Sequence, residues 1–296
     1  MPHHFSHLSR FAAMLCAGAF ALAFPVARAQ DFALTPAHVV AGSPVLIHLE
    51  APGTAKIDGE WLGRPLQFFR GRDGQAWFAL AGVDVEAPPG PSMLKISIAL
   101  NDRAVLDLTR TVDIHPAAYR SESIAVSLKF VEPEPDALKQ IEAEGKLKEK
   151  VFATSAAEPL WTGSFRAPVT AAATDSFGVR RMFNGKLASV HKGMDFRARM
   201  GTPVRAGNSG VVVLARPLYF EGNCVVIDHG LGLFTLSMHL SHIQVHEGQR
   251  VAQGEQLGLS GATGRVTGPH LHWAVRWEGT YLDPAKLLAL NLAAVR

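Results

Sequence analysis

The chain has 296 residues, of which 48% are hydrophobic and 19% are charged, and its formal net charge at pH 7 is +3. This length allows one large hydrophobic core or two modest ones, and we expect two. The small net charge gives no electrostatic basis for a nucleic-acid binder. Gly and Pro residues are dispersed among short apolar runs, which argues against disorder and against a helical bundle.

Residues 1–29 have the features of a signal peptide. Arg10 lies in the basic start, residues 11–24 are apolar, and the small-residue pattern at 27–29 is typical of a cleavage site. The apolar stretch is short for a membrane span, so we predict a cleaved signal and no span afterwards, with an uncleaved anchor as the alternative. The mature protein is then expected in the periplasm, in the cell envelope or outside the cell.

Cysteine usage agrees with this prediction. Cys16 leaves with the signal, so Cys224 has no partner for an internal disulfide. Cys224 lies in an apolar run typical of a buried strand, and we expect it to act as a small hydrophobic residue and not as a catalytic thiol.

Residues 30–116 are predicted to form an Ig-like β-sandwich. Two rows of alternating apolar residues fall on single strand faces, at Val45, Ile47 and Leu49 and at Leu94, Ile96, Ile98 and Leu100. The segment contains no group of His, Asp or Glu at metal-ligand spacing. We therefore expect a scaffold, regulatory or binding module here, and no second catalytic centre.

Residues 117–158 are predicted to be a linker with a helical segment. Strong helix formers and opposite charges at 136–144 favour one or two exposed helical turns, interrupted near Gly145. The alternative is an inhibitory segment beside the catalytic cleft, where a hinge can cover the site.

Residues 159–296 return to strand-and-turn patterning and contain no long amphipathic helix. The fold class is therefore all-β, with a C-terminal antiparallel sheet that bears the chemistry. This excludes the metalloproteases whose His-Glu-x-x-His sequence lies on a helix.

The most informative pattern is the pair His270 and His272. Residues i and i+2 of a strand face the same way, so both imidazoles point to one side while Leu271 and Trp273 face the other. A second group, His191 and Asp195, lies upstream. Two imidazoles and one carboxylate leave an open fourth position on tetrahedral zinc, which is the arrangement of a catalytic site.

Because it contains these residues, the segment 177–285 resembles the lysostaphin/LytM-type zinc endopeptidases, which cut peptide cross-links or bridges in bacterial cell walls. The shared elements, in family order, are His191-x-x-x-Asp195, His239-Leu240 and Gly-Pro-His270-Leu-His272. The resemblance implies that His191, Asp195 and His272 bind one Zn²⁺ per chain. It also implies that His239 and His270 are catalytic histidines that do not bind the metal.

Further positions carry smaller predictions. Asn184 lies just before the first ligand. It either approaches the metal or the substrate, or it is a turn residue. Lys192 and Arg265 flank the ligands, and either bind a carboxylate of an acidic stem peptide or are plain surface charges. Many relatives have Tyr two residues before the catalytic His-Leu, whereas this chain has Ser237, which cannot supply the same aromatic wall or phenolic hydrogen bond to the substrate groove.

Three other histidines are assigned no catalytic role. His242 and His246 are interpreted as solvated or capping residues, and His229 as a turn residue after a strand.

These observations predict an exported zinc endopeptidase that uses a metal-activated water to hydrolyse peptide bonds of peptidoglycan cross-links or stem peptides, with D-alanyl cross-links favoured over Gly-Gly bonds. The alternative from another class is a catalytically inactive LytM-domain regulator that activates another cell-wall hydrolase. Whether a protein activator acts on the enzyme stays open.

Overall fold

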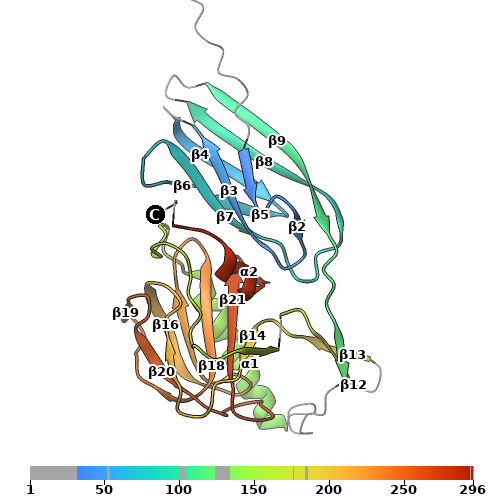
Figure 1. Ribbon diagram of the computed structural model, residues 1–296, viewed down its shortest axis with the longest axis vertical. Coiled ribbons are helices and arrows are strands. Elements are labelled where there is room, and N and C mark those ends of the chain that lie inside the picture. The colour runs from blue at the N-terminus through green and yellow to red at the C-terminus, as the bar shows by residue number, and fades with distance from the viewer. Residues whose placement is uncertain are drawn as a thin grey trace, which may run out of the picture. The chain divides into compact units, whose positions relative to one another are not determined.

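The computed structural model describes residues 32–51, 54–100, 104–123, 134–175, 177–183, 186–293 and 295. Strands dominate these residues, as the ribbon in Figure 1 shows, and the predicted all-β class is confirmed. Among the helices described, none combines the length and the hydrophobicity needed to cross a lipid bilayer. The predicted signal, 1–29, lies outside the described residues.

The N-terminal part consists of two β-sheets whose buried apolar residues belong to one hydrophobic cluster, and this cluster also includes residues of the C-terminal part. The first sheet has the strand order β1-β3-β7-β6 and the second has the order β2-β9-β8-β4-β5. The strands of the first are β1 Phe32–Thr35, β3 Pro44–Glu50, β6 Phe69–Arg70 and β7 Ala76–Gly82. Those of the second are β2 Val39–Val40, β4 Thr54–Trp61, β5 Arg64–Gln67, β8 Gly90–Leu100 and β9 Val105–His115.

The alternating apolar rows predicted for this sandwich face its core. Val45, Ile47 and Leu49 on β3 are each 0% exposed, and Leu94, Ile96 and Ile98 on β8 are buried as well. This alternation sets the pairing register, because a slip by one residue would turn the whole row toward solvent.

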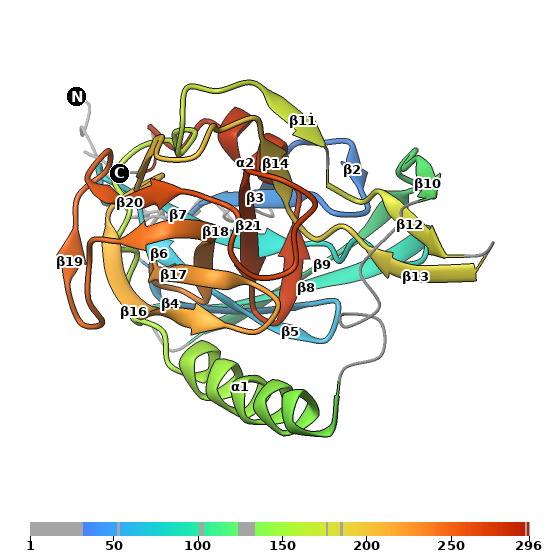
Figure 2. The same ribbon diagram turned by 90° about the horizontal axis from the view of Figure 1, so that it is seen from below.

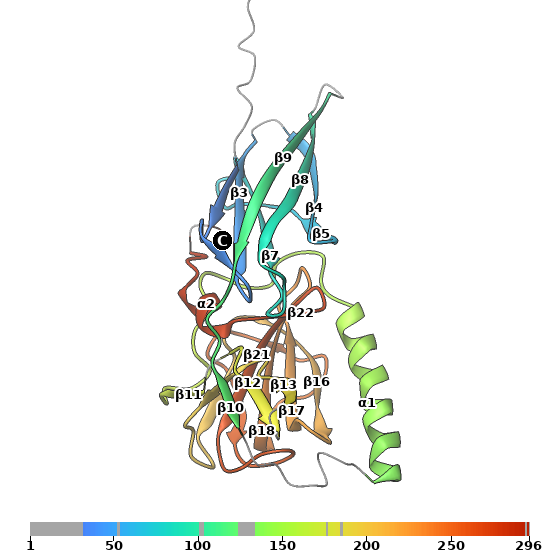
Figure 3. The ribbon, with the colours of Figure 1, turned by 90° about the vertical axis from the view of Figure 1, so that its right-hand side faces the viewer.

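The linker is more ordered than predicted. Helix α1, Pro135–Ala153, runs without interruption through Gly145, so the expected break is wrong. Leu147, Val151 and Phe152 pack against a buried cluster of the C-terminal sheet, and this tertiary packing offsets the roughly 1 kcal/mol that a mid-helix glycine costs. Figure 3 shows α1 alongside β16, Gly210–Leu218, which it contacts.

The C-terminal part is built on a ten-stranded sheet with the order β11-β14-β21-β18-β17-β16-β19, and β15, β20 and β22 branch from this path. Every strand pairing within it is antiparallel, as predicted. Besides β16, its strands are β11 Ala173–Asp175, β14 Met194–Phe196, β15 Pro203–Arg205, β17 Gly222–Asp228, β18 Leu233–Ile243, β19 Arg250–Val251, β20 Gln256–Ser260, β21 Leu271–Trp277 and β22 Thr280–Leu282. The short helix α2, Pro284–Ala289, follows β22.

A smaller sheet of three strands, β10-β12-β13, joins linker and C-terminal residues. Its strands are β10 Ser121–Ser123, β12 Arg180–Phe183 and β13 Lys186–Val190. Strand β10 pairs in parallel with β12, and β12 pairs antiparallel with β13, as the view in Figure 2 shows at one edge. Linker residues therefore take part in the sheet that leads to the first predicted metal ligand.

Cys224 lies on β17 and is 0% exposed, as predicted. Its sulfur is a free thiol, and burial raises the pKa of that thiol. A thiol held protonated in this way is a poor nucleophile.

Candidate metal centre

Strand pairing brings two of the predicted ligands face to face. Asp195 on β14 is the register partner of His272 on β21, and His272 in turn pairs with Met238 on β18. Directly opposed residues of antiparallel strands point to the same side of the sheet. His191 follows the end of β13, and its N–H donates to the carbonyl oxygen of Val179 at 2.8 Å.

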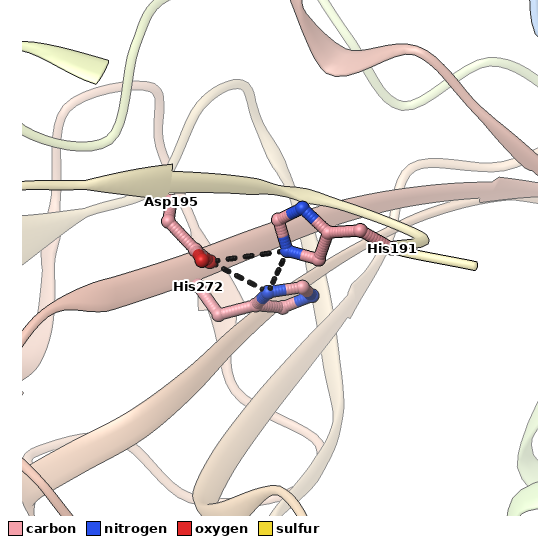
Figure 4. Close-up of side chains that lie close together, drawn as sticks. All are labelled: His191, Asp195 and His272. Carbon is pink, nitrogen blue, oxygen red and sulfur yellow. Dashed lines mark hydrogen bonds and ion pairs between the residues drawn. The ribbon is translucent and has the colours of Figure 1, made fainter. Parts of the chain in front are cut away.

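Three ligand atoms converge in a small triangle, which Figure 4 shows in close-up. Asp195 Oδ1 lies 2.8 Å from His272 Nδ1 and 3.3 Å from His191 Nε2, and the two nitrogen atoms are 3.0 Å apart. His191 and Asp195 are buried, and His272 is partly buried. The three residues form a group that could hold a metal ion.

The chemistry of this triangle fits a cation. Donors bound to one zinc ion at 2.0–2.1 Å in a tetrahedron are separated by about 3.3 Å, close to the observed contacts. With Asp195 ionised and both rings neutral, at most two hydrogen atoms are available for three close contacts, so one contact always lacks a hydrogen bond. A cation at the centre of the triangle would satisfy all three atoms at once.

The protonation states also suit metal binding. Burial acts to raise the pKa of Asp195, but hydrogen bonds from His191 and His272 outweigh it and hold the pKa of the carboxyl well below its usual range. Burial lowers the pKa of His272 despite the neighbouring Asp195. A carboxylate and a neutral imidazole are the forms that bind metal ions.

His239 is brought to this triangle by an irregularity in β18. Its φ is +63°, which is uncommon for a residue other than glycine, and the β17–β18 register shifts at this point. The His239 N–H donates to the carbonyl oxygen of Glu221 at 2.8 Å. The His239 ring then lies 5.0 Å from the ring of His270 and 5.9 Å from that of His272, centre to centre.

Backbone carbonyl groups set the tautomer of both remaining histidines. His239 Nδ1 lies 2.9 Å from the carbonyl oxygen of Thr263, and His270 Nδ1 lies 2.8 Å from that of Gly268. Because a carbonyl oxygen only accepts hydrogen bonds, each Nδ1 carries a hydrogen, and in the neutral ring Nε2 is then the nitrogen with the lone pair. His270 Nε2 is 3.7 Å from Asp195 Oδ1, which places that lone pair beside the triangle.

Burial, followed by the neighbouring His272 and His270, lowers the pKa of His239 to about 3. Its ring is therefore neutral near pH 7. The four histidines and the one aspartate predicted for the site thus lie together, although they come from three separate stretches of the chain.

A hollow of about 260 Å³ opens beside the cluster. Its lining includes Lys192 and Arg265, which were singled out from the sequence. Asn184 lies outside the described residues. His242 and His246 are exposed and are not part of this lining.

His229 follows the end of β17 at a turn, as predicted, but its burial was not foreseen. It is 0% exposed, Nδ1 donates to the carbonyl oxygen of Ser209 at 2.8 Å, and Nε2 lies 2.8 Å from the hydroxyl of Thr235. Burial lowers the pKa of His229 to about 4. It is a neutral, hydrogen-bonded core residue, and its position at the end of β17 concealed this in the sequence.

Sequence reasoning missed several residues of the site. A Cβ atom at Gly193 would lie 2.4 Å from His272 Nε2, so only glycine allows this approach. Phe220 and Tyr281 line the hollow, and they supply aromatic groups where Ser237 cannot. Arg181 lines it as well, with Nη2 at 3.8 Å from Asp195 Oδ2. The glycine between His191 and Asp195 was the one signal visible in the sequence.

The antiparallel sheet and the segments next to it carry four histidines and one carboxylate, and three of these residues form a group that could hold a metal ion. Residues 189–284 match the model of Peptidase family M23. The chain therefore contains a domain of Peptidase family M23, and the resemblance to the lysostaphin/LytM-type peptidases is confirmed.

Relatives support this assignment. The chain is 46% identical over 101 residues to the peptidoglycan DD-endopeptidase ShyA of Vibrio cholerae, a match that covers 34% of this chain and 24% of ShyA. It is 43% identical over 98 residues to the DD-carboxypeptidase/endopeptidase Mpg of Neisseria meningitidis, covering 33% of this chain and 23% of Mpg. The matches thus span about a quarter of the length of these curated relatives.

A solved structure extends the similarity to most of the chain. A Pseudomonas aeruginosa protein assigned to peptidase M23 aligns with a TM-score of 0.63 and 28% identity, covering 84% of this chain and 94% of that one. The similarity therefore reaches beyond the residues that match the family model.

Proposed function

We propose that the protein is an exported zinc endopeptidase that hydrolyses peptide bonds in peptidoglycan cross-links, with D-alanyl cross-links as the preferred substrate. The observation that carries the proposal is the convergence of five side chains: the triangle of His191, Asp195 and His272, and the Nε2 atoms of His239 and His270 beside it. The names of the relatives support peptidoglycan as the substrate class.

In this proposal His191, Asp195 and His272 hold the ion, and their two nitrogen donors and one oxygen donor suit zinc. When bound, zinc supplies Lewis acidity, which lowers the pKa of a water molecule toward about 7 and polarises the scissile carbonyl group. Three protein ligands leave room for one further group at such an ion.

His239 and His270 move the protons. Hydrolysis transfers one proton from the attacking water, forms a C–O bond, breaks the C–N bond and delivers a proton to the leaving amine. A neutral ring with a free Nε2 lone pair can accept the first proton, and the resulting imidazolium can stabilise the developing oxyanion and donate to the amine. The carbonyl groups of Thr263 and Gly268 keep both rings in the required tautomer.

The test is cleavage of defined cross-linked muropeptides by the purified protein, with the products identified by mass spectrometry. We expect new amine and carboxyl ends at the cross-link, and loss of activity in His272→Ala and after chelation, whereas His246→Ala on the exposed surface stays active. Equal activity of His272→Ala and wild type would refute the zinc mechanism.

A further inference from the structure

The hollow beside the metal centre has an excess of basic residues. Arg181, Lys192 and Arg265 line it, and Glu221 is the acidic residue of the lining. Lys148 on α1 lies 2.6 Å from Glu221 Oε1, so the charge of Glu221 is already matched from outside the lining. Lys192 Nζ lies 4.0 Å from Glu86 Oε2 and Arg181 Nη2 lies 3.8 Å from Asp195 Oδ2, so both have an acidic neighbour. The remaining positive charge of the lining is therefore that of Arg265, next to the place where the scissile bond would lie.

The backbone holds Arg265 in the wall of the hollow. Its N–H donates to the carbonyl oxygen of Phe220 at 2.9 Å, and its guanidinium carbon lies 4.6 Å from the centre of the Phe220 ring. Stacking on an aromatic ring fixes the plane of a guanidinium group and leaves its edge available for a ligand. Among the described residues, no carboxylate forms an ion pair with Arg265.

Arg181 brings a second guanidinium group close to the metal centre, with Nη2 at 3.8 Å from Asp195 Oδ2. Partial burial lowers the pKa of Arg265, and the like charge of Arg181 lowers it further, while the charge of Glu221 opposes this shift only in part. Like charges held at one site destabilise each other, and an anion bound between them removes this repulsion.

We propose that Arg265, with Arg181 and Lys192 around it, binds a free carboxylate of the substrate beside the scissile bond. This inference rests on the proposed endopeptidase function and narrows its substrate class. Where the leaving amine of a cross-link belongs to a diamino dicarboxylic acid, the carbon that bears this amine also carries a free carboxylate, which the guanidinium groups can bind. In a Gly-Gly bridge both neighbours of the bond are amides, and the guanidinium groups would have no anion to bind.

The test compares two cross-linked muropeptides that differ only at the carbon bearing the scissile amide nitrogen, with a carboxylate in one and a carboxamide in the other. For wild type we expect kcat/KM to be at least about tenfold higher for the carboxylate. Arg265→Gln should lower kcat/KM for the carboxylate substrate and reduce this preference to less than about threefold. Arg265→Lys, which keeps the charge, should retain an intermediate preference.

The matched control is Arg216→Gln. Arg216 lies on β16 and pairs with Glu247 at 2.7 Å, away from the hollow lining, so the wild-type preference should persist. A merely structural role of Arg265 would lower cleavage of both substrates equally and leave their ratio unchanged.

Two failures are distinguishable. Equal cleavage of both muropeptides by wild type, or an unchanged preference in Arg265→Gln, would overturn the carboxylate site and leave the endopeptidase function standing. Cleavage of neither muropeptide by wild type would overturn the proposed function itself, and this inference with it.

Discussion

Asp195 and His272 face each other across the β14–β21 pairing, and their ligand atoms Oδ1 and Nδ1 are 2.8 Å apart. Because the pairing register alone aligns them, the spacing between the two donors is built into the sheet. His191 completes the triangle from outside that sheet.

The first prediction concerns the carboxylate of this pair. Asp195→Ala removes one of three donors, so we expect the zinc content to fall from one ion per chain to near zero and activity to fall by at least about 10²-fold. Elemental analysis of dialysed protein measures the metal. Asp136→Ala, at an exposed position on α1, is the matched control and should keep its zinc. Stoichiometric zinc in Asp195→Ala would contradict the assigned ligand set.

The second prediction tests the close approach at Gly193. In Gly193→Ala the new methyl group would overlap His272 Nε2, so the ring must move and both zinc affinity and kcat/KM should fall. Overpacking of this kind costs about 1–3 kcal/mol, which corresponds to a loss of roughly 5- to 150-fold. Gly268→Ala is the control, because a Cβ atom there meets nothing within 4 Å. Zinc titration of both variants measures this effect. Equal zinc affinities of Gly193→Ala and Gly268→Ala would rule out a steric requirement for glycine at position 193.

The third prediction concerns the partly buried ion pair between α1 and the hollow. Lys148→Met removes the ion-pair partner of Glu221, whose side chain is 15% exposed, so the free energy of unfolding should fall by roughly 1–3 kcal/mol. Lys146→Met breaks an exposed pair with Glu142 on the same helix, and should cost less than about 0.5 kcal/mol. Urea unfolding of the two variants measures the difference. Similar losses of unfolding free energy would show that the Lys148–Glu221 pair stabilises the protein no more than the exposed pair does.

The fourth prediction uses the depressed pKa of His229. Its folded-state pKa is about 4, below the ordinary value of 6.5, so the unfolded chain binds more protons between these pH values. Stability should therefore be lost as the pH falls from 6.5 through 4, by up to about 3 kcal/mol from this group. In urea unfolding, His229→Gln should lose less stability over this range than wild type, while His246→Gln, at an exposed position, should follow wild type. Parallel pH curves for wild type and His229→Gln would contradict the prediction.

Features that depend on strand alternation could be predicted from the sequence. Leu271 and Trp273 are 0% and 1% exposed while His270 and His272 face the site, as the period of two requires. The same rule placed Leu94 in the sandwich core. Alternation is local, so a single stretch of sequence contains the whole signal.

Features that depend on contacts between distant segments could not be predicted from the sequence. The length of α1 follows from its packing on the C-terminal sheet, and the basic hollow combines Arg181 with Arg265 from opposite ends of the domain. The burial of His229 depends on Ser209 and Thr235, which flank it only after folding. No periodic sequence pattern predicts such contacts, because each segment contributes only a single residue to the contact.

His191 differs from the other four site residues in the sheet that supports it. It follows β13 of the three-stranded sheet, whereas Asp195, His239 and His272 lie on strands of the larger one and His270 immediately precedes β21. An ion shared by His191 and His272 would therefore cross-link the two sheets, as a disulfide between distant strands does. Because β10 of the linker pairs with β12, demetallation should accelerate amide hydrogen exchange in 121–123 and 180–183 ahead of the core strands β17 and β18.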